Sequence, residues 1–130
     1  MMESNGGFFR GSCLLLYGAC FFGKVLDLST TRVGLQLGAF EHNFVSRSLF
    51  ALVGFNVTAA FDFVVVASFV AVSELMFWRV AKADVPGRLR ILSNVVTLFV
   101  WLGVFASICV TVAGNLTILQ QLGNPHLFLV

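Results

Sequence analysis

The chain contains few charged residues. Of its 130 residues, 11% are Asp, Glu, Lys or Arg, whereas soluble globular domains carry about 25%. Hydrophobic residues make up 58% of the chain, and its mean hydropathy is +0.96. This composition excludes an ordinary soluble domain and predicts an integral, multi-pass membrane protein. The length fits one domain, because two halves would each be too small to bury a core.

Several function classes lack their usual residues. The net charge is only +2, and the basic residues do not form the stripe that binds phosphates, so nucleic acid is not an expected partner. No nucleophile is paired with a base, and His42 and His126 lie on separate segments that do not suggest a zinc or haem site. We therefore expect no enzyme activity, no metal and no cofactor. The apolar helix faces suit neighbouring helices, structural lipids or pigments, and the sequence does not choose between these.

Cysteine, too, is scarce and unpatterned. Cys13, Cys20 and Cys109 lie in apolar runs without C-x-x-C spacing, which favours their role as small apolar side chains over a redox or metal role.

Residues 8–28 form the first apolar run, "FFRGSCLLLYGACFFGKVLDL". Its length matches the roughly 20 residues that cross a hydrocarbon core as a helix. No small-x-small cleavage site follows it, so we interpret it as a retained span and not as a signal peptide. Lys24 and Asp27 then lie near its end, within reach of the headgroups, and residues 29–46 form a connection outside the membrane.

The second apolar run, 44–80, would extend about 55 Å as one helix, nearly twice the hydrocarbon thickness. It is either one long helix or two short ones that fold back at Asp62. The neighbours of Asp62 are Phe and Ala, which are poor turn residues. The pattern therefore favours a single helix over 47–80.

A third span is predicted over 90–122, joined to the second by the basic loop 81–89. The positive-inside rule places this loop on the inner side of the membrane. The fold class is therefore an all-α membrane protein with three transmembrane helices, the second and third long and antiparallel. The N-terminus is then inside and the C-terminus outside. The basic residues at this loop are Arg79, Lys82, Arg88 and Arg90.

Small side chains recur at helical spacing in each span, which favours close helix packing. In the second span they precede Asp62 on the same face. The residues of these faces are Ala51, Gly54 and Thr58 in the second span, Gly103, Ser107 and Thr111 in the third, and Ala19 and Gly23 in the first.

Asp62 is a carboxylate near the middle of its expected span. Intramembrane carboxylates suggest function, such as a proton or ion relay. Tyr17 and Ser107 come from comparable depths, so we predict a polar contact of Asp62 with these residues or with a neighbouring subunit. Without a cationic partner, Asp62 is expected to be neutral and to donate a hydrogen bond. Glu74 is expected to pair with a residue of the basic loop.

The function expected from these features is a non-catalytic accessory or scaffold subunit of a larger membrane complex. An organellar respiratory-chain or ATP synthase assembly is one such complex, and the mitochondrial inner membrane is favoured over plastid or plasma membrane. The expected partners are other membrane subunits and lipids. The alternatives are a small oligomeric transporter or channel that uses Asp62, and a tetraspan-like membrane organiser, which needs the hairpin form of 44–80.

Overall fold

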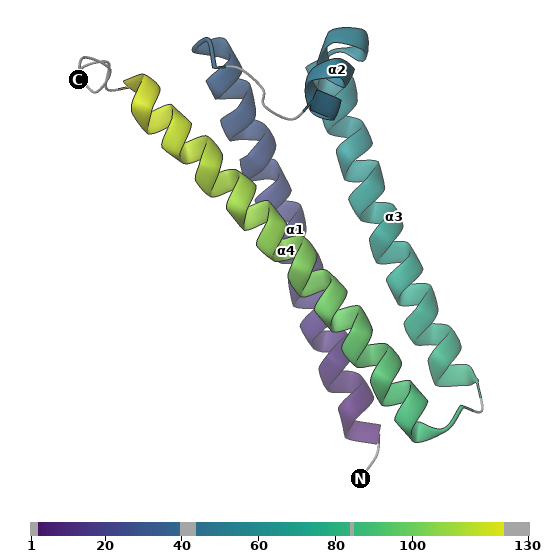
Figure 1. Ribbon diagram of the computed structural model, residues 1–130. Helices are drawn as coiled ribbons and strands as arrows, with labels where there is room; N and C mark the ends of the chain where they lie inside the picture. The colour runs from purple at the N-terminus through teal and green to yellow at the C-terminus, as the bar shows by residue number, and fades with distance from the viewer. Residues whose placement is uncertain (1–2, 40–43, 84, 124–130) are drawn as a thin grey trace.

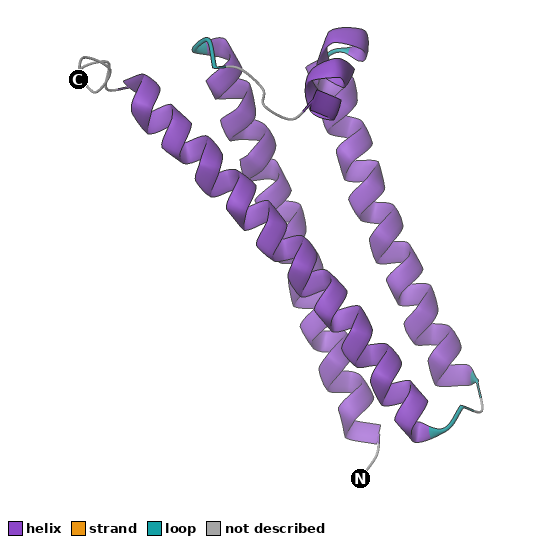
Figure 2. Ribbon diagram, in the orientation of Figure 1, coloured by secondary structure: helices purple, strands orange, loops and turns teal. Residues whose placement is uncertain are grey.

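The chain folds into helices only, over the part that the structure describes. The computed structural model describes residues 3–39, 44–83 and 85–123 (Figures 1 and 2). This result confirms the predicted all-α class for these residues. The helices are α1 (Glu3–Gln36), α2 (Phe44–Val53), α3 (Phe55–Lys82) and α4 (Gly87–Gly123). Three of them, α1, α3 and α4, are long and apolar enough to cross a membrane.

The helices α1 and α4 form the main pair and cross each other along much of their length (Figure 1). Their contacts follow the same order along both helices, since Tyr17 packs on Trp101 and, further along, Asp27 contacts Asn115. The two helices therefore run in the same direction. Fewer contacts join α3 to α1 and α4. The bundle is therefore a tight pair with a more loosely attached third helix.

The contacts between α1 and α3 run in opposite order along the two helices. Arg10 near the start of α1 pairs with Glu74 in the second half of α3, and Lys24 pairs with Asp62 in the first half. These two ion pairs fix the register of α3 against α1.

The buried core is small and lies between α1 and α4. It consists of Cys13, Tyr17, Cys20 and Trp101, and all three cysteines of the chain are free thiols. Most large apolar side chains point outward, such as Leu15 at 79% exposed. Leaving so much apolar surface in water would be costly, so this surface suits apolar surroundings.

The first helix is longer than predicted. It continues to Gln36, so residues 29–36 are helical and not part of a connection. The helix ends in a Schellman motif, in which Gly38 adopts a φ of 89°. The amide of Ala39 donates to the carbonyl of Gly34 at 2.8 Å, and the amide of Gly38 donates to the carbonyl of Leu35 at 3.2 Å. Glycine is favoured at this left-handed position because it has no Cβ.

The expected single helix over 47–80 is interrupted at Gly54. This residue has φ 84° and ψ 160°, a conformation essentially restricted to glycine, and it separates α2 from α3. The amide and hydroxyl of Thr58 both donate to the Gly54 carbonyl, at 3.2 and 3.0 Å, which starts α3. The helix then passes through Asp62 without a break, so the hairpin alternative is wrong.

The turn between α3 and α4 is shorter than the predicted loop 81–89. Arg79 and Lys82 belong to the last turn of α3, and α4 begins at Gly87. Pro86 directly precedes this helix, and its carbonyl accepts from the amides of Leu89 and Arg90 at 2.9 and 3.2 Å. The helix ends close to the predicted position, at Gly123.

Candidate functional site

The centre of the candidate site is the ammonium group of Lys24, which contacts two carboxylates from different helices. Its Nζ lies 2.8 Å from Oδ2 of Asp27, one turn further along α1, and 3.0 Å from Oδ2 of Asp62 on α3. The side chains of Lys24, Asp27 and Asp62 are 20%, 10% and 34% exposed. The pair on α1 is thus well covered, while Asp62 lies at the open side.

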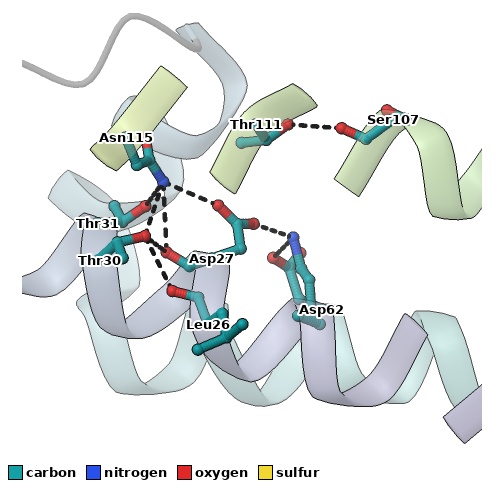
Figure 3. A network of polar contacts seen from close by, with 9 residues as sticks. Leu26, Asp27, Thr30, Thr31, Asp62, Ser107, Thr111 and Asn115 are labelled. Carbon is teal, nitrogen blue, oxygen red and sulfur yellow. Dashed lines mark hydrogen bonds and ion pairs between the residues drawn. The ribbon is translucent and has the colours of Figure 1, made fainter. Parts of the chain in front are cut away.

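Asn115 of α4 completes the network (Figure 3). Its Nδ2 donates to Oδ1 of Asp27 at 3.0 Å and lies 2.9 Å from the hydroxyl of Thr31 and 3.2 Å from that of Thr30. Both oxygens of Asp27 are therefore engaged, one by Lys24 and one by Asn115. Since the three charged groups and the amide come from α1, α3 and α4, the network ties all three long helices together.

A cavity of about 270 Å³ adjoins this network. The charged groups, Asn115, and Ser107 and Thr111 of α4 line it, and Ser46 and Phe50 of α2 also border it. The break at Gly54 is what brings α2 over this end of the bundle (Figure 1). The cavity is large enough for several water molecules and presents polar partners to them.

Two carboxylates and one ammonium leave one negative charge in excess if all three groups are ionised. An uncompensated charge away from water is costly. The arrangement can therefore accept one positively charged group from a partner beside Lys24. Nucleophilic catalysis has no obvious nucleophile here, since Ser107 and Thr111 have no base placed to activate them among the contacts described.

The structure changes the predicted surroundings of Asp62. Ser107 does line the same cavity, but Tyr17 lies elsewhere, packed edge-on against Trp101 with ring centroids 4.6 Å apart. Tyr17 precedes Lys24 by about 10 Å along α1. Asp62 instead has a cationic partner in Lys24, which removes the reason for expecting it to be neutral.

Sequence reasoning missed Lys24, Asp27 and Asn115 as members of this site. The first two were placed at the membrane edge because the span was ended at residue 28. Asn115 begins an N-x-T pattern and gave no sign of a contact with α1. The i,i+3 spacing of Lys24 and Asp27 was the available signal, since such residues share a helix face.

A second polar contact lies at the opposite end of the bundle. Arg10 donates through Nη2 and Nε to Oε2 of Glu74, at 2.7 and 3.1 Å. This corrects the expectation that Glu74 pairs with the basic loop. Next to it, Nε1 of Trp101 donates to the hydroxyl of Ser73 at 2.9 Å, so the buried indole joins α4 to α3.

Of the small residues predicted to form packing faces, Gly23 makes the closest approach. A Cβ built there would lie 2.8 Å from Cγ2 of Ile108 on α4. Thr58 is buried on α3. By contrast, a Cβ at Gly103 would meet nothing within 4 Å, and Gly54 serves the backbone break. The other members of these faces are Ala19, which is half-buried, and Ala51, Ser107 and Thr111, which are exposed.

The basic residues near the turn are all exposed. Lys82 places its Nζ 4.1 Å from the centroid of the Trp78 ring, a cation–π contact that suits an aromatic residue at a membrane boundary. The remaining members of this group are Arg79, Arg88 and Arg90.

No group of three His, Cys, Asp or Glu that could hold a metal ion occurs among residues 3–39, 44–83 and 85–123. Comparison of the chain with family models, with curated proteins and with solved structures found no match.

Proposed function

We propose that this protein is a non-catalytic subunit of a membrane complex that packs against the helices of partner proteins. In this proposal α1, α3 and α4 span the membrane. The helices α3 and α4 are antiparallel, and the basic turn between them lies on the inner side. The mitochondrial inner membrane, and an energy-converting complex within it, remain predictions from the sequence.

The observation that supports this proposal most directly is the incomplete cover of the ion pair between Lys24 and Asp62. The Asp62 side chain is 34% exposed, and its neighbours on α3 are exposed apolar residues, with Phe61 at 58% and Val65 at 37%. Charged groups inside a membrane normally face protein or water and not lipid. A partner helix with a positively charged side chain at this level would cover the pair and compensate the excess negative charge of the group formed by Lys24, Asp27 and Asp62.

A small oligomeric transporter or channel is the second candidate. The 270 Å³ polar cavity beside Lys24, Asp27 and Asp62 favours it, because such a cavity could hold water and pass a proton to a carboxylate. Three spans do not enclose a pore alone, so this function requires several copies of the chain.

The tetraspan-like organiser loses its structural basis. It needs a fourth span within 44–80, but α2 is 10 residues long and extends only about 15 Å, half the hydrocarbon thickness.

Native electrophoresis of the endogenous protein in mild detergent tests the proposal. We expect migration in a large complex with other proteins, and we expect Asp62→Asn to weaken that association, because the amide keeps the shape but removes the charge. Ser68→Ala is the control, since Ser68 is exposed on α3 and its hydroxyl donates to the carbonyl of Val64 in its own helix. A lone monomer would contradict the proposal. A pure homo-oligomer whose ion flux is lost in Asp62→Asn would support the transporter instead.

A further inference from the structure

A groove between the end of α1 and the start of α3 has a polar mouth. Arg32 and Gln36 of α1 and Asn56 of α3 line it together with Val53, Phe55 and Val57, and its volume is about 570 Å³. Gln36 is the last residue of α1 and Asn56 is the second of α3. The polar groups therefore lie together where α1 ends and α3 begins.

The polar side chains of this mouth form no side-chain hydrogen bond or ion pair among the described residues. No carboxylate of residues 3–39, 44–83 or 85–123 forms a salt bridge with Arg32, whose guanidinium lies 5.9 Å from the centroid of the Phe55 ring. The amides of Gln36 and Asn56 likewise take part in none of the side-chain hydrogen bonds within those segments. A guanidinium beside two amides presents several N–H donors to one space, which suits a phosphate group.

The groove continues toward the middle of the bundle as an open, mostly apolar part of about 280 Å³. Arg32, Phe55 and Asn56 border both parts, and Val25, Leu28, Ala59 and Phe63 line the inner part. The ring of Phe63 stacks on that of Phe21, with centroids 6.3 Å apart and an interplanar angle of 6°. From Arg32 to Val25 the groove extends about 10 Å along α1.

We propose that this groove binds an anionic phospholipid, with its phosphate on Arg32, Gln36 and Asn56 and one acyl chain along Ala59 and Phe63. The charge of Arg32 at the mouth and the apolar inner part match the two parts of such a lipid. This proposal rests on the membrane insertion proposed above, but not on the identity of any partner protein.

Native mass spectrometry of the full chain, purified in mild detergent and incubated with phosphatidylglycerol or phosphatidylcholine, tests it. We expect the protein to retain phosphatidylglycerol in preference to phosphatidylcholine. Arg32→Gln should reduce phosphatidylglycerol retention about tenfold, as for the loss of a charge-assisted hydrogen bond. Arg88→Gln is the matched control, because Arg88 is also exposed but lies at the opposite end of the bundle.

Ala59→Phe tests the apolar part separately, since the larger ring would occupy the inner part of the groove and should lower the retention of both lipids. Equal retention of the two lipids by the wild-type chain, or unchanged phosphatidylglycerol retention in Arg32→Gln, would overturn the proposal. Carbonate extraction of the cellular membranes separates this outcome from failure of the proposed function. A chain that resists extraction but shows no lipid preference contradicts only the lipid site.

Discussion

Lys24 is the residue through which α1 and α3 are joined at the polar cluster, because its ammonium contacts carboxylates from both helices. In a low-dielectric interior such a contact is strong, but only while both signs are present. The site therefore stabilises the fold as long as Asp27 and Asp62 both stay paired with Lys24. Replacing Lys24 alone removes the cation from both ion pairs and therefore tests this directly.

Lys24→Met should destabilise the protein by about 2–4 kcal/mol, because it leaves two carboxylates without their cation. The loss is smaller than for a fully buried pair, because solvent screens the partly exposed Asp62. Thermal unfolding in detergent, followed by circular dichroism, measures the loss. Lys82→Met is the control, since Lys82 is exposed and lies over the Trp78 ring. It should change stability by less than about 1 kcal/mol. Equal effects of the two substitutions would show that the ion pairs contribute nothing specific.

Gly23→Ala should also destabilise the protein, by about 1–3 kcal/mol. The added methyl group would lie 2.8 Å from Cγ2 of Ile108, so α1 and α4 must move apart. Gly18→Ala is the matched control on the same helix, because a Cβ there meets nothing within 4 Å. The double variant Gly23→Ala with Ile108→Ala removes the clashing atom and should recover part of the loss. If it recovers none, the close approach is not the cause.

At the scale of the helices, the existence of each long helix could be predicted from its apolar run, but the ends could not. The end of α1 depends on the positive φ of Gly38. Gly34, four residues earlier, instead stays helical, and a Cβ there would lie 3.9 Å from Cδ2 of Leu119. The break before α3 depends on Gly54, which the sequence pattern assigned to a packing face. Spacing shows which residues share a face, but not which glycine leaves the helical conformation.

The sequence predicted only part of the candidate site, because spacing along one helix does not show which residues of another helix lie beside it. Asp62 and Ser107 line one cavity, but the contacts with Lys24 and Asn115 depend on the relative register of three helices. Tyr17 and Lys24 are two turns apart on α1, so a difference in register of about 10 Å decides which of them lies beside Asp62. Apolar runs do not specify register to that precision.

Gly54→Ala should straighten or strain the junction between α2 and α3, because L residues rarely adopt its φ of 84°. The strain is worth about 1–3 kcal/mol, and continuing the helix through position 54 relieves it. Spin labels at Ser48→Cys and Val72→Cys, in a Cys109→Ala background, measure the outcome. A continuous helix would separate these backbone positions by about 36 Å, and the bent native form should give a shorter distance. An unchanged distance would show that the bend does not depend on glycine.

At the scale of the whole molecule, two ion pairs fix α3 to α1 at levels about 20 Å apart along the helices. Arg10 with Glu74 lies near the start of α1, and Lys24 with Asp62 lies toward its other end. Between them the aromatic contact of Tyr17 with Trp101 joins α1 to α4. The order of these contacts places the start of α1 and the turn after α3 at one end of the bundle (Figure 1).

This arrangement predicts which positions share one side of the membrane. Single cysteines at Gly7 and Ala83 should react with an impermeant maleimide from the inner side, and one at Leu37 from the outer side. All three positions are exposed. The background is Cys109→Ala, since Cys13 and Cys20 are buried. A cysteine at Ala67 on α3 is the control for membrane burial and should react from neither side. Labelling of positions 37 and 83 from the same side would contradict the three-span arrangement, because α3 would then not cross the membrane between them.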